Sequence, residues 1–415
     1  MQVLLILNII FGALFLLCYL HQVIVYAPVG LICKWKKRKH KETKLHKLAI
    51  LVAARNEEAV IGQLLDSLNR QDYPRDLFHI FVVADNCTDG TKRVAESYGA
   101  TAYERFNTEQ IGKGYALDYL LTCIDRDYGK GAFDAFVLFD ADNLARHNFL
   151  TELNKTFSDG YEIVTGYRNS KNYGDSWIAA GSGMWFIRAC ATLNTARNAI
   201  GSSAELAGTG FMFSNKIKEE NGGWPFHLLT EDTEFMVNSV LKGYTVGYAP
   251  DAEFFDEQPT TFRQSWVQRL RWAKGGIQVF KAYGLALFRG IFSKNFKSCY
   301  DFSLSITPAF LLALITVVTD LVGSVVVSFL GEAKAALLMF AAILGGLYLL
   351  LLLAFGIVTL SEWRRIRASA WKKILYTFTF PLFMFTYVPI VFCAVFSKHV
   401  TWQPIEHKRS DMEDL

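Results

Sequence analysis

The sequence predicts an α/β domain with a mostly parallel sheet, joined to α-helical transmembrane segments. The first observation is an alternation of apolar runs and amphipathic stretches from Leu48 to about Tyr248, which is typical of β-α-β units. The second is composition, because hydrophobic residues make up 52% of the chain and the mean hydropathy is +0.20. The third is that apolar stretches long enough to cross a bilayer flank the alternating region on both sides.

The N-terminal stretch, residues 3–29, is almost purely apolar and long enough to cross a bilayer core of about 30 Å. The basic run KWKKRKHK follows at residues 34–41, and basic residues favour the cytosolic side of a membrane. We therefore expect a transmembrane helix over residues 1–30, with the chain after Lys34 in the cytosol. A cleaved signal peptide is the alternative, although no Lys or Arg precedes the apolar stretch.

The alternating region is expected to form one domain over residues 45–275. Strands are expected for KLAILVAA (47–54), FHIFVVAD (78–85) and AFVLFDAD (135–142), and helices for EEAVIGQLLDSLNR (57–70), TDGTKRVAESYGA (88–100) and GKGYALDYLLTCI (112–124). Strands separated by helices of this length imply β-α-β units and hence a mostly parallel sheet. No Pro- or Ser-rich linker divides the sequence of this region.

A mixed apolar and basic stretch follows the domain. Residues 276–300 carry a stripe that includes Ile277, Phe280 and Leu287, with Lys281 among its basic residues. That mixture predicts an amphipathic helix in the membrane interface. An ordinary surface helix of the domain is the alternative.

The C-terminal region, residues 301–397, contains three apolar stretches, at 302–330, 335–360 and 374–396, each long enough to span a bilayer. The basic loop between the second and third stretches is expected in the cytosol. The last stretch is interrupted by two prolines and could instead be re-entrant, because the basic tail, residues 398–415, also favours the cytosol.

Charge and cysteine usage exclude several classes of protein. The formal net charge is only +4, and the basic residues cluster beside apolar stretches, which indicates membrane orientation and no nucleic-acid partner. The seven cysteines show no CxxC pairing, so neither a disulfide framework nor a zinc site is expected.

The stretch FDAD, residues 139–142, carries the clearest chemical signal. An apolar run that suits a buried strand leads directly into Asp140 and Asp142. Unpaired carboxylates are costly to bury, whereas the carboxyl ends of strands in open α/β sheets form ligand sites. The i, i+2 spacing lets both carboxylates approach one hard cation that keeps a substrate phosphate among its ligands. An Asp-containing turn after a strand is the alternative explanation.

Polar residues also follow the first two predicted strands. Asn56 and Glu57 stand at a strand end where a nucleotide can dock, and Asp85 is placed to hydrogen-bond a base or a ribose. The alternatives are an acid-bearing helix N-terminus and a simple turn. Lys113 lies between two glycines at a predicted helix start and suits a phosphate, although the tripeptide GKG alone is a weak signal.

Two motifs lie further along the domain. AGTGF, residues 207–211, places Gly208 and Thr209 in flexible backbone that suits either close approach of a sugar or acceptor or a tight turn. TEDTEF, residues 230–235, opens a predicted helix. Its acids, Glu231 and Asp232, either perform chemistry or complement the helix dipole.

QRLRW, residues 268–272, lies on a predicted helix and places Gln268, Arg271 and Trp272 on one face, at i, i+3 and i+4. An amide, a guanidinium and an indole on one face can bind pyrophosphate and stack on a sugar ring. A surface arginine beside a packed tryptophan is the alternative.

Asp85, FDAD, TED and QRLRW, in this order and spacing, resemble the processive branch of the family 2 glycosyltransferases, which includes cellulose, hyaluronan and poly-N-acetylglucosamine synthases. The resemblance covers about residues 48–276 and implies a GT-A fold, a Rossmann-like α/β domain. QRLRWAKGG is close to the form in poly-N-acetylglucosamine synthases. AGTGF departs from the FFCGS-type segment of cellulose synthases, which leaves the sugar open.

The resemblance implies a role for each motif residue in an inverting transfer from a nucleotide sugar. Asp232 would be the general base, and Asp140 and Asp142 would meet the diphosphate through Mg²⁺ or Mn²⁺. Nucleotide-sugar contacts are expected from Asn56, Glu57, Asp85, Lys113, Asp140, Asp142, Gln268 and Arg271. Acceptor contacts are expected from Gly208, Thr209, Glu231 and Trp272.

The expected function is that of a multi-pass enzyme of the plasma membrane, with a cytosolic catalytic domain, that elongates and exports a β-linked polysaccharide. UDP-glucose or UDP-N-acetylglucosamine is the expected donor. Transfer of a single sugar to a lipid is the alternative, and membrane lipids are expected partners in both cases. Four expected spans leave little material to enclose a channel, which favours a homodimer or an accessory subunit. A nucleotide-sensing transporter or scaffold is a third class, against which the intact acids Asp142 and Asp232 argue.

Overall fold

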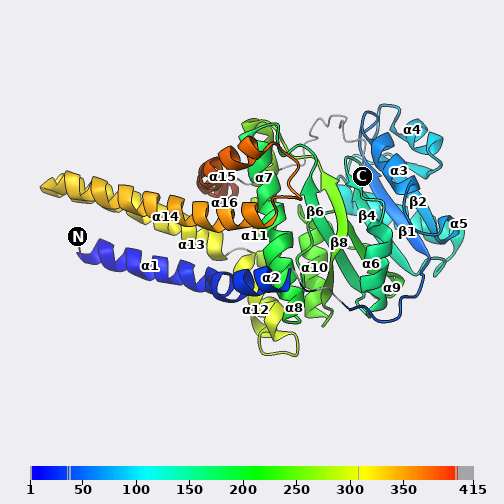
Figure 1. Cartoon of the computed structure of the whole chain (residues 1–415), viewed down its shortest axis with the longest axis horizontal. Helices are drawn as coiled ribbons and strands as arrows, with labels where there is room; N and C mark the ends of the chain where they lie inside the picture. The colour runs from blue at the N-terminus through cyan, green and yellow to red at the C-terminus, as the bar shows by residue number, and fades with distance from the viewer. Residues whose placement is uncertain (1, 35, 37–38, 307, 398–399, 401–415) are drawn as a thin grey trace.

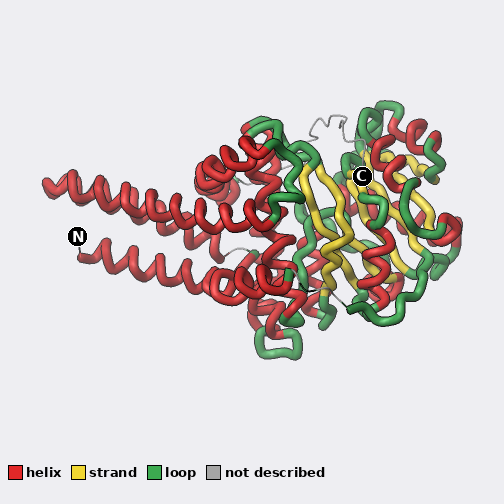
Figure 2. Tube along the Cα trace, in the orientation of Figure 1, coloured by secondary structure: helices red, strands yellow, loops and turns green. Residues whose placement is uncertain are grey.

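The computed structural model describes residues 2–34, 36, 39–306, 308–397 and 400. Its α/β domain is built on an eight-stranded sheet with helices on both faces (Figures 1 and 2). The strands are β1 Leu48–Ala54, β2 Phe78–Asp85, β3 Thr101–Arg105, β4 Ala135–Asp140, β5 Leu144–Ala145, β6 Ile163–Ser170, β7 Phe211–Ser214 and β8 Val246–Asp256. Their spatial order is β3-β2-β1-β4-β7-β6-β8-β5.

The sheet is parallel in one half and mixed in the other. β1 pairs in parallel with both β2 and β4, and β2 pairs in parallel with β3. β6 and β8 also run parallel, but β7 is antiparallel to both of its neighbours, β4 and β6. The expected α/β fold is therefore confirmed, and the carboxyl ends of β1, β2 and β4 meet at one edge.

The core has two layers because β1 is covered on both faces. Ala49 and Leu51 pack with α5 and α10, whereas Ile50 and Val52 pack on the opposite face with α3 and α6. A strand covered on both faces favours a continuous apolar run, as the sequence of β1 has. The helices of the domain are α3 Ile61–Asn69, α4 Thr91–Ser97, α5 Lys113–Tyr128, α6 Phe149–Ser158, α7 Trp177–Arg188, α8 Thr195–Ala199, α9 Asn215–Asn221 and α10 Glu231–Leu241, with a 3-10 turn η2 Arg75–Leu77 and a π-helical segment η3 Ala189–Asn194.

A single long helix, α11 Phe262–Gly290, follows the sheet. It begins at a capping box in which the Thr261 hydroxyl accepts from the backbone N–H of Gln264 at 3.3 Å. The stretch expected as a separate interfacial helix, residues 276–300, is the second half of α11 together with the start of α12 Phe296–Ser305. Val279 and Leu287 of this stretch pack into the domain core, while Phe288 is 58% exposed.

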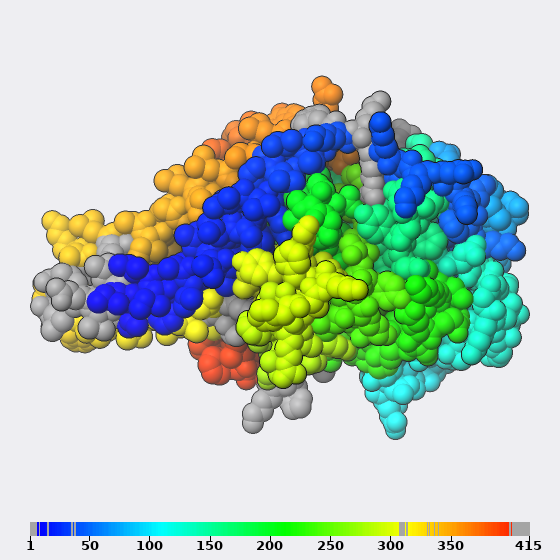
Figure 3. All heavy atoms as spheres, turned by 90° about the horizontal axis from the view of Figure 1, so that it is seen from below, coloured from blue at the N-terminus to red at the C-terminus, as the bar shows by residue number. Residues whose placement is uncertain are grey.

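Apolar helical segments before β1 and after α12 lie outside the sheet. They are α1 Gln2–His21, η1 Gln22–Tyr26, α2 Ala27–Cys33, α13 Pro308–Val327, η4 Ser328–Glu332, α14 Ala333–Ser361, α15 Ala370–Phe385 and α16 Tyr387–Phe396. α1 lies beside α13, and the two project with α14 from the end of the molecule opposite β2 and β3 (Figures 1 and 3). α15 packs on α7, and α16 packs on α11, so the apolar helices and the α/β domain share contacts.

Within the described residues, three helices are long and apolar enough to cross a membrane: Ile9–Cys33, Ala333–Ser361 and Ala370–Phe396. The stretch 302–330, expected to be another span, contains the end of α12 and all of α13, of which Leu314–Val327 is a shorter apolar helix. Apart from residue 400, the expected tail 398–415 lies outside the described residues.

Candidate active site

The two carboxylates of the FDAD stretch stand where β4 ends. The backbone N–H of Asp140 donates to Thr209 Oγ1 at 2.9 Å. The side-chain amide of Asn143 donates to Asp142 at 3.3 Å and to Asp256, the last residue of β8, at 2.8 Å. These bonds fix the end of β4 against β8 and hold the nearly buried Asp142 in one place.

Lys113, the first residue of α5, connects this strand end with two other segments. Its ammonium group donates to the Asp140 carboxylate and to the carbonyl oxygen of Gly208, the latter at 2.8 Å, and lies 3.9 Å from Glu231. Burial acts to lower the pKa of Lys113, but the carboxylates of Asp140 and Glu231 oppose it, and the pKa is raised. The lysine is therefore held as a cation within the site.

The turn after residue 206 depends on glycine. Gly208 has φ +82°, and Gly210 has φ +64°, a left-handed backbone that side chains rarely adopt. A Cβ atom on Gly210 would lie 2.1 Å from the ring of Phe254, so no larger residue fits there. A Cβ atom on Gly208 would lie 3.6 Å from Asp232 Oδ2, which shows that this carboxylate faces the turn.

Glu231 and Asp232 open α10. Thr230 occupies the N-cap position, yet its side chain makes no capping hydrogen bond. Burial raises the pKa of Glu231 to about 7; Lys113 acts in the opposite direction, and the neighbouring Asp232 adds to the rise. Burial also raises the pKa of Asp232, against a hydrogen bond from the backbone of Thr233. Raised carboxyl pKa values in a cleft are typical of groups that exchange protons.

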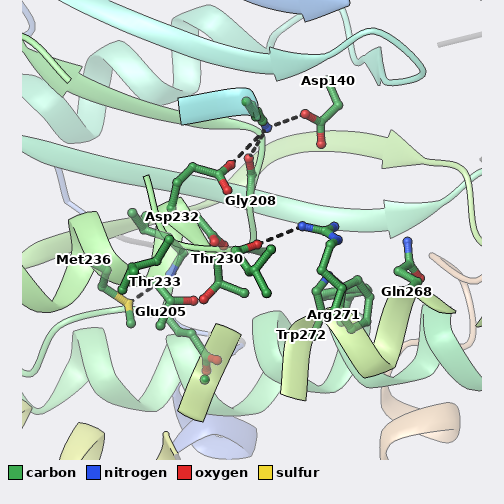
Figure 4. A pocket seen from close by; sticks show the side chains of 18 of the residues that line it. Asp140, Glu205, Gly208, Thr230, Asp232, Thr233, Met236, Gln268, Arg271 and Trp272 are labelled. Atoms are coloured by element: carbon green, nitrogen blue, oxygen red, sulfur yellow. Dashed lines mark hydrogen bonds and ion pairs between the residues drawn. The ribbon is translucent and has the colours of Figure 1, made fainter. Parts of the chain in front are cut away.

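The QRLRW motif faces these acids from α11. Figure 4 shows Gln268, Arg271 and Trp272 on one helix, with the Arg271 guanidinium directed toward the segment that carries Thr230. Arg271 donates to the carbonyl oxygen of Leu229 at 2.9 Å. The Trp272 ring packs edge to face on the ring of Phe186, with centroids 5.7 Å apart.

α11 approaches the start of α10 closely because residue 275 is glycine. A Cβ atom on Gly275 would lie 2.5 Å from the Thr230 side chain. A larger residue would therefore push α11, and with it Arg271, away from Asp232.

The other end of the site lies at β1 and β2. Asp85, at the end of β2, forms an ion pair of 2.6 Å with Arg105, the last residue of β3 and its neighbour in the register. Asn56 has φ +58°, and its side-chain oxygen accepts from the backbone N–H of Thr88 at 2.8 Å. Asn56 therefore joins the two loops that follow β1 and β2.

These residues surround one cavity of about 780 Å³. Of the residues expected in the site, it is lined by Glu57, Asp85, Lys113, Asp140, Asp142, Gly208, Glu231, Asp232, Gln268, Arg271 and Trp272. Asn56 and Thr209 do not line it, because Asn56 bonds to the neighbouring loop and Thr209 is fully buried behind Asp140. The cavity also reaches Tyr19 and Val391 of the apolar helices, and Ile306, the residue that follows α12.

Several polar residues of the site were not expected from the sequence. Arg168 on β6 pairs with Asp256, and its guanidinium also donates to the carbonyl oxygen of Ala207, just before the glycine turn. Lys171 donates to the Asp142 carbonyl oxygen at 2.7 Å. Asp256 has a weaker form of the signal that precedes Asp140, because it directly follows the apolar pair Phe254 and Phe255. The arginine and the lysine have no comparable local signal.

The carboxylates of this site can bind a divalent cation only if substrate oxygens or water complete its coordination. In the described part of the chain, no group of three or more His, Cys, Asp or Glu residues could hold a metal ion. Asp140 and Asp142 line the cavity, and Mg²⁺ is commonly bound by one or two carboxylates with water and substrate phosphates. The residues present fit a cation of that kind.

Comparison with known proteins identifies the family to which this α/β domain, with its acid-lined cavity, belongs. The sequence profile described as Glycosyltransferase like family 2 matches residues 46–275, more than half of the chain. The chain belongs to this family. A mannosyltransferase from Pyrobaculum calidifontis, solved with GDP-Man and Mn²⁺, shares the GT-A fold: the TM-score is 0.61 at 18% identity, over 95% of this chain and 100% of that one.

Three curated relatives illustrate the range of the family. Probable glycosyltransferase YdaM of Bacillus subtilis is 26% identical over 278 residues, 62% of this chain and 61% of the relative. Beta-monoglucosyldiacylglycerol synthase of Synechocystis is 27% identical over 237 residues, which are 57% of this chain and 49% of the relative. Poly-beta-1,6-N-acetyl-D-glucosamine synthase of Staphylococcus epidermidis is 20% identical over 243 residues, which are 58% of this chain and 57% of the relative. The chain thus spans about half to three fifths of the length of these relatives.

Proposed function

We propose that this protein transfers a hexose from a UDP-sugar, with inversion at the anomeric carbon, to an acceptor that enters the site from the membrane side. The observation that carries the proposal is the single cavity that Asp140, Asp232 and Tyr19 all line. A donor held at the strand ends and an acceptor held between apolar helices would meet beside Asp232.

In the proposed reaction Asp232 accepts the proton of an acceptor hydroxyl group. The acceptor oxygen attacks the anomeric carbon from the face opposite the diphosphate, and the bond to the diphosphate oxygen breaks with its electron pair. UDP leaves, and the proton remains on Asp232 until solvent removes it. Asp85 would hold the uridine portion of the donor, since it lies at the end of β2 with Arg105 fixing its carboxylate.

Positive groups on both sides of the cavity would stabilise the departing diphosphate. Lys113 and Arg271 line the cavity from α5 and α11, and each has a backbone carbonyl partner that orients it. A divalent cation held by Asp140 and Asp142, when bound, would neutralise further charge on the diphosphate.

A lipid is the acceptor class that the cavity walls favour. Beyond Asp232 the lining includes the apolar side chains of Leu193, Phe302, Ile306 and Val391. The similarity to beta-monoglucosyldiacylglycerol synthases supports this choice. Elongation of a β-linked polysaccharide is the second candidate, supported by the indole of Trp272 in the cavity wall and the similarity to poly-beta-1,6-N-acetyl-D-glucosamine synthases.

Product analysis tests the proposal. Purified full-length protein in lipid vesicles should be offered UDP-glucose, UDP-N-acetylglucosamine and, as a comparison, GDP-mannose, each with a radiolabelled sugar. A lipid transferase gives label in an organic-extractable product that carries one β-linked sugar. High-molecular-weight, glycosidase-sensitive product at early times would establish the polysaccharide candidate instead, and transfer from GDP-mannose alone would contradict the UDP-sugar donor.

A further inference from the structure

Arg188, the last residue of α7, lines the cavity beside the N-terminal apolar helix. Its guanidinium donates to the side-chain oxygen of Gln22 at 2.9 Å. The same group lies 5.1 Å from the ring centroid of Trp185. Gln22 belongs to η1, within the N-terminal apolar helix that is long enough to cross a membrane. A charged group therefore stands where the cavity reaches the membrane-side helices.

Arg188 has no carboxylate partner within ion-pair distance among the described residues, and in this it differs from its neighbours. Arg197 pairs with Asp301 at 2.6 Å and with Glu205 at 2.8 Å. Arg168, further along the same cavity, pairs with Asp256. Each of these cations has a carboxylate in direct contact, whereas Arg188 has a neutral amide as its hydrogen-bond partner and is influenced by the Glu205 carboxylate only from beyond ion-pair distance.

Keeping a charged guanidinium in the protein without an ion-pair partner costs free energy. Burial acts to lower the pKa of Arg188, although an arginine stays charged at all ordinary pH values. A buried charge is stabilised by an opposite charge with good hydrogen-bond geometry, and a guanidinium matches phosphate oxygens in particular. The cavity itself provides the space for such a group beside Arg188.

The cavity that Arg188 lines has apolar walls as well as polar ones such as Gln22 and Glu205. Leu193, Phe302 and Ile306 line the same cavity from η3, α12 and the residue that follows α12. A free inorganic anion would leave this apolar surface uncovered, whereas an amphiphile would satisfy the charge and the walls together.

We propose that Arg188 binds the phosphate of an anionic lipid and that the acceptor of this enzyme is a phosphate-bearing lipid, a proposal that rests on the transfer to a lipid inferred above. Arg188 is then a specificity-determining residue, because it separates phosphate-bearing lipids from neutral ones such as diacylglycerol. The sugar acceptor would lie with its phosphate at Arg188 and its acyl chains between the apolar helices.

Lipid binding by the wild-type protein gives the first test. Full-length protein in maltoside micelles should bind dioleoyl phosphatidic acid at least about tenfold more tightly than dioleoylglycerol, as expected for one hydrogen-bonded charge pair. Equal affinity for the two lipids would overturn the proposal. Inorganic phosphate should not displace the lipid; if it does so as well as phosphatidic acid, the site takes a free anion and the lipid assignment fails.

Variants of Arg188 give the second test. Arg188→Gln should remove the preference for phosphatidic acid, and Arg188→Lys should retain part of it, with UDP affinity unchanged in both. Arg289→Gln, which removes an exposed positive charge of α11 outside the cavity, is the control and should keep the full preference. If Arg188→Gln keeps the preference while UDP still binds, Arg188 is not the anion site. Absence of sugar transfer from any donor, with lipid selectivity intact, would refute the proposed function and with it the acceptor role of the lipid, but not phosphate binding by Arg188.

Discussion

The ammonium group of Lys113 donates a hydrogen bond to the carbonyl oxygen of Gly208 at 2.8 Å and contacts the Asp140 carboxylate at the same time. Gly208 in turn lies against Asp232, since a Cβ atom there would be 3.6 Å from Asp232 Oδ2. One lysine thus couples the strand end that would face the diphosphate to the turn that faces the proposed base.

Lys113→Met should reduce turnover by about 10²–10³-fold, the usual effect of removing one oriented donor from a site of developing charge. UDP affinity should also fall, whereas Lys113→Arg should restore part of both, because it keeps the charge. Steady-state kinetics and isothermal titration with UDP measure these effects. Lys130→Met, an exposed lysine in the loop after α5, is the control. Normal turnover in Lys113→Met would exclude a role at the diphosphate.

The sequence predicted the strand ends well because each carries a local signal. An apolar run followed by an acid identifies both Asp85 and Asp140, and the structure brings the two to the same edge of the sheet, on strands either side of β1. Glycine spacing likewise identified the turn at Gly208, whose positive φ only glycine readily adopts.

Features set by tertiary contact were not predictable in this way. The reversal of β7 depends on pairing with β4 and β6, which no local pattern encodes. Arg105 and Arg168 reach the site across the sheet, and their own sequence neighbours give no hint of it. The pairing of Arg188 with a neutral amide, Gln22, depends on the contact between the end of α7 and η1, which no local pattern encodes.

Removal of divalent cations should strongly reduce transfer. Asp140 and Asp142 are negatively charged, so without a bound cation they would repel the leaving diphosphate. A bound metal ion contributes several kcal/mol to stabilising such charge, so turnover in excess EDTA should fall at least about 10²-fold. Restoration by Mg²⁺ or Mn²⁺ is the matching control. Asp142→Asn should raise the metal concentration needed for half-maximal activity, and full activity in EDTA would remove the metal from the mechanism.

Asp232→Asn should lower turnover by about 10²–10⁴-fold, the usual contribution of a general base, because an amide cannot accept the acceptor proton. UDP affinity should remain near that of the wild type, since Asn keeps the size of the side chain, and thermal stability should not fall, since the substitution removes a buried charge. Thr233→Ser, which changes the adjacent residue without touching a carboxylate, is the control. If Asp232→Asn instead loses stability and its folded fraction works normally, the residue serves the start of α10 and not the chemistry.

Glu231 should make the protein less stable as the pH rises from about 4.5 to about 7. Burial raises the pKa of this carboxyl to about 7 in the folded chain, against an ordinary value of 4.5. Between these two values the folded state binds more protons than the unfolded state, so the free energy of unfolding falls with rising pH. The loss nears completion about one pH unit above 7 and is on the order of 3 kcal/mol. Asp232, whose pKa burial also raises, adds a change of the same sign.

Glu231→Gln should therefore flatten the dependence of stability on pH. An amide stays neutral, so the variant should be more stable than the wild type at about pH 8 and closer to it at about pH 5. Thermal unfolding of the full chain in detergent micelles, followed across this range, gives the comparison. Glu109→Gln, at an exposed position in the loop before α5, is the matched control and should follow the wild-type curve. Asp232 contributes to the residual slope in Glu231→Gln, which should fall further when Asp232→Asn is added. A wild-type curve that rises through this pH range, or a Glu231→Gln curve with an unchanged slope, would mean that the charged form of Glu231 is fully balanced by Lys113.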